Sequence, residues 1–407
     1  MGFSPAASDE TPALRIPPPD FLSSTALGAV LAALPGARVV GGAVRDALAG
    51  RPVADIDLAT RMRPEEVIRR LHQAGLKAVP TGIDHGTVTA VAGHCGFEVT
   101  TLRRDLETDG RHAVVGYTDD WREDAARRDF SFNAMSMAAD GAVFDYFGGA
   151  ADLSAGTVRF VGDAPTRIAE DYLRILRFFR FQARYGIGPP DPAAVAAIRD
   201  GVPGLARLSP ERVWSELKRI LSVPDPAAAV ALMQATGVLA AVVPEGASPA
   251  RLAALIHADA PADPLLRLAA LLDGDAAALA ARLRLSTAER ERLSVLRHGE
   301  VPADDADDAT LRRALADTPA DILVGRAWLA GRGAALRQRL AALPRPVFPL
   351  QGRDLQAAGF AAGPALGETL RALRDWWWEG GCVADRDACL AALAALESAV
   401  RRARNSQ

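Results

Sequence analysis

The chain has 407 residues, a net charge of −3 and 49% hydrophobic residues; this length exceeds one compact core and predicts two to four domains. Mean hydropathy is only +0.06, and no apolar run approaches the roughly 20 residues of a membrane crossing, so no membrane partner is expected. Its three cysteines, Cys95, Cys382 and Cys389, are too few and too scattered for a disulfide framework or a zinc cluster.

The first residues lack the basic and apolar stretches of a secretory signal. Together with the scattered cysteines, this indicates a cytoplasmic protein. Residues 1–20 contain three consecutive prolines at 17–19 and are predicted to form a disordered leader. The sequence makes no prediction about oligomeric state.

Residues 21–150 alternate short β-type runs with a helical pattern. Strands are predicted over 38–40, 55–59, 87–91, 97–102 and 143–147, with a helix over 64–74. From about residue 151 the strand signals give way to long helical patterns that glycines and prolines interrupt. The predicted fold class is therefore α+β. A head with a small mixed sheet (21–150) precedes an all-α neck (151–225) and an all-α body and tail (226–407).

The first chemical motif combines a Gly-Gly turn with two carboxylates. Gly41 and Gly42 separate a predicted strand from a predicted helix, where the backbone can approach a triphosphate. Asp55 and Asp57 follow, and residues i and i+2 of a strand project from the same face. Such close carboxylates repel each other unless a cation neutralises them, and their oxygens suit Mg²⁺. A bare pair is usually two solvated carboxylates, but the Gly-Gly turn upstream favours a metal site.

A third carboxylate, Glu98, lies between apolar residues in a predicted strand that can run beside the first one. Two interpretations are open. Glu98 either supports the metal site or is an ordinary solvated strand residue.

A second motif is the Arg-Arg-Asp run at 127–129. Adjacent arginines can bind triphosphate oxygens, and Asp129 can accept a hydrogen bond from a ribose hydroxyl. In isolation such a run is usually a solvated helix end. The preceding residues 103–124 are polar and show little periodicity, which predicts a loop.

A third motif lies in the predicted helix over 170–181. Its charged residues fall on one half of the helix, with Leu173 and Phe181 intruding, and most aromatic and aliphatic residues fall on the other half. The charged residues are Glu170, Asp171, Arg174, Arg177 and Arg180. Three arginines spaced three apart indicate a row of guanidinium groups for phosphates and a base edge. The alternative is an amphipathic packing helix.

Asp171 and Arg174 form a chemically specific pair. A carboxylate accepts a hydrogen bond from an exocyclic amine, and a guanidinium donates to a ring nitrogen. Cytosine and adenine both present this donor–acceptor order on their Watson–Crick edges. Uracil and guanine present the reverse order and leave buried groups unpaired, at roughly 1–3 kcal/mol per group. The pair can therefore accept C and A and reject U and G.

These motifs carry a resemblance to a known family. The segments 41–46 and 55–60 resemble the first motif of class II tRNA nucleotidyltransferases and bacterial poly(A) polymerases, within the polymerase β nucleotidyltransferase superfamily. The run 127–135 resembles the second motif, with Ser131 where Thr is more usual. Residues 170–181 resemble the amino-acid template motif, and 208–218 the fifth motif. The resemblance is strong over roughly 37–220 and weaker over 350–380.

The resemblance implies a role for each matching position. Gly42, Arg45 and Arg128 would contact the nucleotide, and Asp55 and Asp57 would bind Mg²⁺. It further implies that the template pair reads the incoming base, that 103–124 is a mobile loop, and that the fifth motif packs in support of the template helix.

The sequence therefore predicts a CCA-adding enzyme that transfers CMP and AMP from CTP and ATP to the 3′ end and acceptor region of tRNA. A bacterial poly(A) polymerase shares every head motif, but overall acidity and a short basic C-terminus disfavour it. An inactive RNA-binding relative is the second alternative. Residues 376–378 are three tryptophans, which can stack on RNA bases or bury a helix end.

Overall fold

The computed structural model describes residues 11–108 and 113–405. Its chain divides into two compact units, Met1–Pro244 and Glu245–Gln407, which are described separately. The predicted boundaries at residues 150 and 225 remain predictions. Within the described ranges, no helix combines the length and apolar character that crossing a membrane requires.

The head in the first unit is built on a mixed sheet. In the described part of the chain this sheet has eight strands in the order β1-β10-β9-β2-β3-β6-β5-β4. All neighbours are antiparallel except β3 and β6, which run parallel. The strands are β1 Leu14–Arg15, β2 Arg38–Val40, β3 Asp57–Thr60, β4 Lys77–Gly82, β5 Thr87–Ala92, β6 Cys95–Thr101, β9 Ser136–Met137 and β10 Ala142–Phe144.

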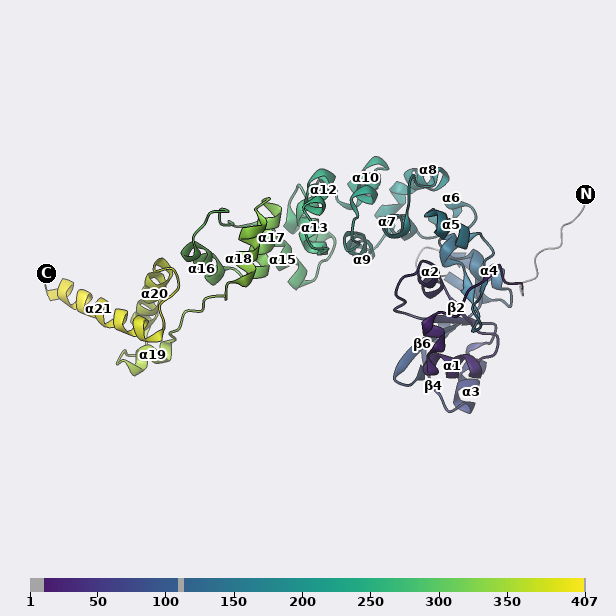
Figure 1. Cartoon of the computed structure of the whole chain (residues 1–407), viewed down its shortest axis with the longest axis horizontal. Coiled ribbons are helices and arrows are strands. Elements are labelled where there is room, and N and C mark those ends of the chain that lie inside the picture. Colours follow the sequence, from purple (N-terminus) through teal and green to yellow (C-terminus); the bar gives the residue numbers. More distant parts are fainter. Residues whose placement is uncertain (1–10, 109–112, 406–407) are drawn as a thin grey trace, which may run out of the picture. The chain divides into compact units, whose positions relative to one another are not determined.

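Helices α1 and α3 pack against this sheet (Figure 1). Their buried residues, Leu27 and Val30 on α1 and Val67 and Leu71 on α3, repeat at helical spacing and cover the strands. The helices of the head are α1 Thr25–Ala33, α2 Gly42–Leu48, α3 Pro64–Gln73, α4 Trp121–Ala126 and α5 Gly149–Ala155.

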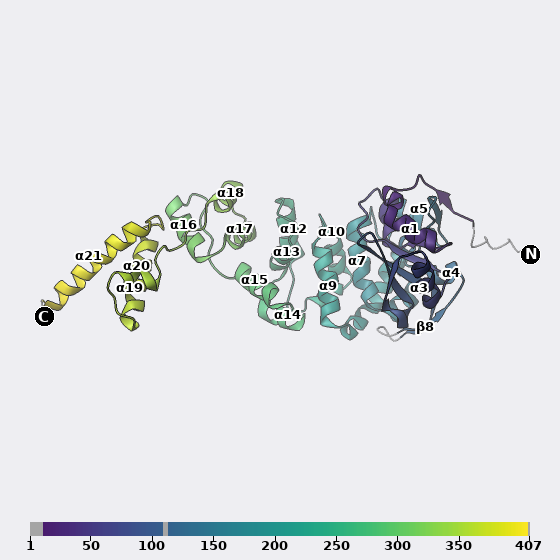
Figure 2. The same ribbon diagram turned by 90° about the horizontal axis from the view of Figure 1, so that it is seen from below.

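The remainder of the first unit is helical, and α7 packs against both α9 and α10 (Figures 1 and 2). Its helices are α6 Ala164–Glu170, α7 Leu173–Tyr185, α8 Pro192–Gly201, α9 Pro210–Leu221, α10 Ala227–Ala235 and α11 Val238–Val242. The start of α9 is as predicted, with Ser209 at the N-cap and Pro210 in the first turn.

An aromatic core joins the head to α7. Phe130 and Phe132 contribute rings from the second motif, and Phe178 and Phe181 contribute rings from α7. Ring centroids of Phe130 and Phe181 lie 5.2 Å apart in an edge-on arrangement, which is favourable for aromatic pairs. All four residues are buried. This packing fixes the charged residues that alternate with them, and those residues form the candidate site.

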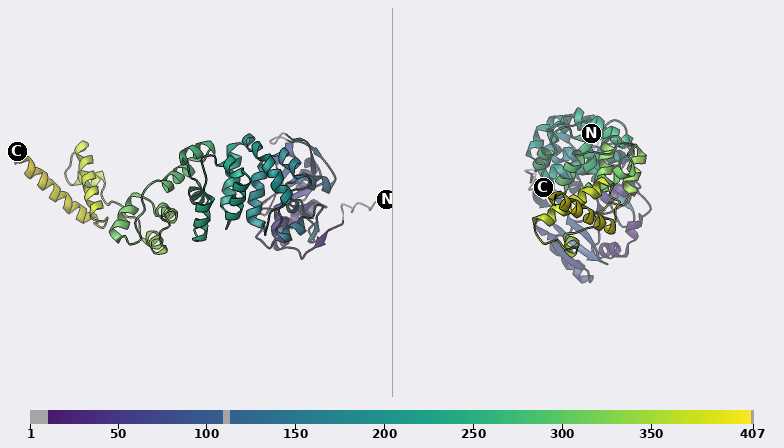
Figure 3. Two further views of the ribbon diagram at one scale, coloured as in Figure 1. Left: turned by 90° about the horizontal axis from the view of Figure 1, so that it is seen from above. Right: turned by 90° about the vertical axis from the view of Figure 1, so that its left-hand side faces the viewer.

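The second unit consists of helices. They are α12 Pro249–His257, α13 Pro264–Leu271, α14 Ala276–Arg282, α15 Thr287–Arg297, α16 Asp308–Asp317, α17 Ala320–Leu329, α18 Ala334–Ala342, α19 Gly352–Ala357, α20 Pro364–Glu379 and α21 Arg386–Asn405. The last two, coloured yellow-green to yellow, pack against each other (Figures 1 and 3). The α+β class with a helical remainder is confirmed.

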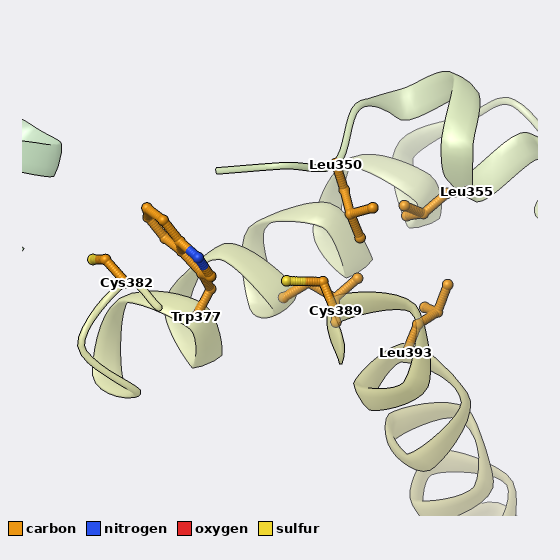
Figure 4. Close-up of a cluster of buried hydrophobic side chains, with 7 residues drawn as sticks. Leu350, Leu355, Trp377, Cys382, Cys389 and Leu393 are labelled. Carbon is orange, nitrogen blue, oxygen red and sulfur yellow. The ribbon is translucent and has the colours of Figure 1, made fainter. Parts of the chain in front are cut away.

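The three tryptophans at the end of α20 differ in burial. Trp377 is buried among Leu355, Leu393 and other residues of a hydrophobic cluster, and its indole N–H donates to the carbonyl of Ala384 at 3.1 Å (Figure 4). Trp376 and Trp378 are exposed. Burial of a helix end therefore describes Trp377, and stacking on RNA by Trp376 or Trp378 stays a prediction.

Two predictions about irregular segments are wrong. The predicted leader 1–20 includes strand β1, where Leu14 pairs with Val143 of β10, because its apolar residues can extend the edge of the sheet before the prolines begin. Residues 1–10 lie outside the described residues. The predicted loop 103–124 contains the hairpin of β7 Arg103–Thr108 and β8 Ala113–Tyr117, followed by α4; residues 109–112 lie outside the described residues. Its predicted mobility stays a prediction.

Candidate active site

A pocket of about 480 Å³ in the first unit collects most of the predicted site residues. It lies where the Gly-Gly turn, the second motif and the start of α7 meet. Its lining comprises Gly41, Gly42, Arg45, Asp57, Arg128, Asp129, Asn133, Asp171, Leu173, Arg174, Arg177, Arg180, Phe181 and Arg212. Six of these residues are arginines, so the pocket suits an anionic ligand.

The glycine turn allows an arginine to approach the backbone closely. Gly41 has φ +67°, a conformation that other residues rarely adopt, and a Cβ there would lie 3.0 Å from Nη1 of Arg128. Gly42 begins α2, so backbone N–H groups of the first helical turn lie beside this arginine. The turn therefore brings the guanidinium of Arg128 and the start of α2 close together.

Arg45 on α2 is held by three hydrogen bonds to two side chains. Its Nε and Nη2 donate to the two carboxylate oxygens of Asp46 at 3.0 Å each, and its Nη1 donates to Oδ1 of Asn133 at 2.7 Å. Asp46 also accepts a hydrogen bond from the hydroxyl of Tyr185. Burial by itself raises the pKa of Asp46, but the hydrogen bonds from Arg45 and Tyr185 lower it below its ordinary value. Arg45 is therefore a fixed positive charge at the pocket wall.

The predicted metal ligands lie at the start of β3. Asp57 is the first residue of the strand, and in the parallel register it lies opposite Glu98 of β6. Asp55 precedes the strand, so the prediction that β3 starts at residue 55 is wrong by two residues. The strand begins at Asp57 because its pairing with β2 begins there, opposite Val40.

Three carboxylates influence one another at this end of the sheet. Burial raises the pKa of Asp57, the charges of Glu98 and Asp55 raise it further, and Arg128 opposes them. This repulsion is the property expected of carboxylates that a cation would neutralise. In residues 11–108 and 113–405, no group of three or more His, Cys, Asp or Glu side chains is arranged to hold a metal ion. Glu98 is therefore a charged neighbour of Asp57, and its supporting role at a metal site stays a prediction.

Arg128 is oriented by a buried carboxylate that the sequence analysis did not select. Its Nη2 donates to Oδ2 of Asp124 at 3.2 Å. Oδ1 of Asp124 accepts from the backbone N–H of Arg103 at 3.2 Å and from Nε of Arg127 at 3.0 Å. Asp124 therefore connects the base of the β7–β8 hairpin with both arginines of the second motif.

Asp129 and Arg177 form an ion pair inside the pocket wall. Nε of Arg177 donates to Oδ2 of Asp129 at 2.6 Å, and Nη2 lies 2.5 Å from the same oxygen. Oδ1 of Asp129 accepts from the amide of Asn133 at 3.0 Å, so Asn133 bridges Arg45 and Asp129. Burial raises the pKa of Asp129, but the Arg177 charge and the Asn133 hydrogen bond lower it below its ordinary value.

This ion pair leads to a pH-dependent prediction. Because its folded-state pKa is depressed, Asp129 stabilises the protein above the unfolded-state pKa of about 4, and this stabilisation is lost as pH falls. We expect Asp129→Asn to lower the free energy of unfolding by about 3 kcal/mol at pH 7, with a smaller difference from the unchanged protein below pH 4. Chemical denaturation at several pH values measures this difference.

The matched control is Asp140→Asn, because Asp140 pairs with Arg15 at the surface and both side chains are more than half exposed. Its cost should stay below about 1 kcal/mol. Equal costs for the two substitutions at pH 7 would contradict the assignment of Asp129 as a buried, charged member of the site.

The segment that contains the predicted template pair is interrupted. A single helix over 170–181 was predicted, but α6 ends at Glu170 and α7 begins at Leu173. Asp171 lies between them with an extended backbone (φ −155°, ψ 105°). The reason is local: Oδ1 of Asp171 accepts the backbone N–H of Leu173 at 3.1 Å, a hydrogen bond that competes with helix formation.

Arg174 is anchored by neighbouring elements. Nη1 donates to the carbonyl of Arg167 at 2.7 Å and to Glu170, and Nη2 donates to the carbonyl of Arg127 at 3.1 Å. These bonds use three of its five N–H donors, so it keeps donors for a ligand. Glu170 is outside the pocket lining and pairs with both Arg167 and Arg174.

Arg180 lies deeper along α7. Its Nη1 donates to Oε1 of Glu216 at 3.0 Å, and its guanidinium lies 4.5 Å from the ring centroid of Phe181. Burial lowers the pKa of Arg180 to about 10, with Glu216 opposing this shift. Arg180 is therefore still charged at neutral pH.

The structure thus brings nine of the predicted site residues together and leaves three others outside the pocket lining. The nine are Gly42, Arg45, Asp57, Arg128, Asp129, Asp171, Arg174, Arg177 and Arg180, and the three outside are Asp55, Glu98 and Glu170. Sequence reasoning missed Asn133 and Arg212, although both belong to segments with family-like motifs. For Asn133 the available signal was a polar residue in the mostly apolar run 130–135, whereas Arg212 lies among other polar residues and carried no such signal.

Two protein-family models match this chain. The family described as "Poly A polymerase head domain" matches residues 37–159, and the one described as "Probable RNA and SrmB- binding site of polymerase A" matches 190–248. The fold and the pocket define a nucleotidyltransferase with a poly(A) polymerase-type head.

Relatives that match most of this chain define the kind of nucleotidyltransferase more closely. The mitochondrial CCA tRNA nucleotidyltransferase 1 of Danio rerio is 38% identical over 88% of this chain and 86% of its own length. The human protein of the same name is 36% identical over 87% and 85%. A crystal structure of the Bacillus stearothermophilus CCA-adding enzyme in complex with CTP is 28% identical, with a TM-score of 0.71 over 91% of this chain and 94% of that one. The chain belongs to the CCA tRNA nucleotidyltransferase family.

Proposed function

We propose that this protein adds CMP and then AMP, from CTP and ATP, to the 3′ end of tRNA without a nucleic-acid template. The observation that carries the proposal is the single pocket that contains Asp57, the phosphate-binding arginines and the pair Asp171 and Arg174. Metal-binding, triphosphate-binding and base-reading groups are all needed for nucleotidyl transfer in which the protein itself selects the base. Their presence around one cavity of about 480 Å³ supports this function.

Asp55 and Asp57 would hold Mg²⁺ in this proposal. Their carboxylate oxygens are hard ligands, and the raised pKa of Asp57 beside Glu98 and Asp55 indicates negative charge that a cation would relieve. Bound Mg²⁺ would activate the attacking 3′-hydroxyl and stabilise the leaving pyrophosphate. Glu98 would contribute through its charge.

The chain's own residues would position the nucleotide. Arg128, beside the Gly41–Gly42 turn, would bind the triphosphate, with Arg45, Arg177 and Arg180 adding positive charge along the pocket. Asp129 would accept from the ribose. These contacts are the same for every nucleotide, so they supply binding and orientation but no choice of base.

Choice of base would come from Asp171 and Arg174. Asp171 would accept the exocyclic amine of C or A, and Arg174 would donate to the adjacent ring nitrogen. Both residues are in the pocket lining, and Arg174 keeps unused donors. U and G would place a carbonyl oxygen against Asp171 and an N–H against Arg174, which leaves both pairs unsatisfied.

The helical neck (151–225) and the body and tail (226–407) would both bind RNA. In the second unit, the exposed Trp378 borders a pocket that also contains Arg345, Arg371 and Arg374. Aromatic rings and arginines together suit stacked bases and phosphates. A cytoplasmic location is part of the proposal and is supported by three free cysteines.

A transcript of tRNA that lacks its 3′ CCA tests the proposal. With CTP alone the product should grow by two residues, with ATP alone it should grow little, and with both it should grow by three and stop. High-resolution gel electrophoresis of end-labelled tRNA measures these lengths. Long A-tails from ATP alone would show a poly(A) polymerase, and no extension under any condition would show an inactive RNA-binding relative.

A further inference from the structure

Arg212 is a pocket residue that comes from α9, outside the template segment. Its Nη2 donates to Oδ2 of Asp171 at 2.7 Å, and about a third of the Arg212 side chain and a quarter of the Asp171 side chain are exposed. The contact joins residues 41 positions apart in the sequence. It therefore links the base-reading carboxylate to a different helix.

The two oxygens of Asp171 have different partners. Oδ1 accepts the backbone N–H of Leu173, and Oδ2 accepts from Arg212. The terminal torsion of an aspartate side chain is soft, so one hydrogen bond alone does not fix its plane. The bond from Arg212 is the second hydrogen bond to this carboxylate, and it determines how the carboxylate faces the pocket.

Helix α9 is a rigid support for this contact. Its residues Val213, Trp214 and Leu217 are buried, and the helix packs against α7. It also supplies Glu216, whose Oε1 accepts from Arg180 at 3.0 Å. Helix α9 therefore holds two pocket residues. Arg212 in its first turn contacts Asp171, and Glu216 one turn further on contacts Arg180.

We infer that Arg212 is a positioning residue that sets the plane of the Asp171 carboxylate and thereby the preference for bases with an exocyclic amine beside a ring-nitrogen acceptor. This inference rests on the proposed function. Arg212 acts through Asp171 and not by touching the nucleotide. Its loss should therefore change the choice of nucleotide more than the rate of transfer.

The test compares kcat/KM for CTP and UTP on tRNA lacking its 3′ CCA. Arg212→Ala should lower the CTP/UTP ratio by roughly tenfold, because a freely rotating carboxylate distinguishes the two base edges less well. Arg212→Lys keeps a donor but loses the planar fork, so its ratio should be intermediate. Lys218→Ala, which removes a charge from the exposed side of the same helix, should leave the ratio unchanged.

A double-mutant cycle separates positioning from direct contact. In an Asp171→Ala background, Arg212→Ala should cause no further change in the ratio, because the group through which it acts is absent. The same tenfold loss in that background would overturn the inference, and so would an unchanged ratio in the single variant. If the unchanged protein and Lys218→Ala incorporate no CMP, the proposed function itself has failed; normal CMP incorporation restricts any failure to Arg212.

Discussion

Asp57→Ala is expected to reduce incorporation of all four nucleotides together by on the order of 10³-fold, since metal-ion catalysis supplies several kcal/mol of transition-state stabilisation. Asp55→Ala should have an effect of the same size. Neither base selection nor folding should change. Asp57 is the first residue of β3, and the charges of Glu98 and Asp55 repel its own, so its removal relieves repulsion.

Steady-state incorporation of labelled CMP and AMP measures this loss, and thermal unfolding without metal verifies that the variants fold. Glu65→Ala is the matched control, because Glu65 is an exposed carboxylate in the first turn of α3. Removal of divalent cations with EDTA should abolish activity, and Mg²⁺ should restore it. Activity within tenfold of the unchanged protein in both aspartate variants would exclude these residues as the metal ligands.

The residue types that line the pocket could be predicted from the sequence better than the contacts that hold those residues in place. Four residues could be selected because carboxylates and arginines seldom combine in these local patterns for another purpose: Asp57, Arg128, Asp171 and Arg174. All four line one pocket. Each motif reports the residue types that a ligand needs, and those types are visible within a few positions of one another.

The contacts that hold these residues could not be predicted in the same way. Asn133 bridges Arg45 and Asp129, and Arg212 pairs with Asp171 across 41 positions. Such partners depend on which elements pack together, and a single sequence does not contain that information. The break between α6 and α7 was missed for a different reason, since helical periodicity continues through Asp171 while its side chain bonds to the backbone locally.

The order of the sheet was also beyond local patterns. Strands β2, β3, β5 and β6 were predicted, but the parallel pairing of β3 with β6 places Glu98 opposite Asp57. That register gives Glu98 its influence on the pKa of Asp57. Two-residue strands such as β1 and β9 are too short for an alternating pattern to be recognised.

The second large effect is expected at the template pair, where Asp171→Ala should change which nucleotide enters. The substitution removes the acceptor for the amine of C or A, and it also removes the carboxylate that repels the carbonyl oxygens of U and G. The lost discrimination should be about 1–3 kcal/mol, or roughly 5- to 150-fold in the CTP/UTP ratio of kcat/KM.

Arg174→Ala should reduce the overall rate more than Asp171→Ala does. Arg174 donates to the carbonyls of Arg167 and Arg127 as well as to Glu170. Its removal therefore loosens the connection between α7 and the segment that carries Arg128, in addition to removing the donor for the ring nitrogen. Discrimination and rate should both fall in this variant.

Selection of C and A by a carboxylate–guanidinium pair is the central claim, and single-nucleotide incorporation kinetics with each of the four nucleotides test it most directly. The comparison needs the unchanged protein, Asp171→Ala and Asp57→Ala on tRNA lacking its 3′ CCA. We expect Asp57→Ala to slow the incorporation of all four nucleotides equally. We expect Asp171→Ala to continue nucleotide transfer but to lose its preference for CTP over UTP. An Asp171→Ala protein that is uniformly slower, with an unchanged CTP/UTP ratio, would contradict the claim and leave Asp171 as a structural residue at the start of α7.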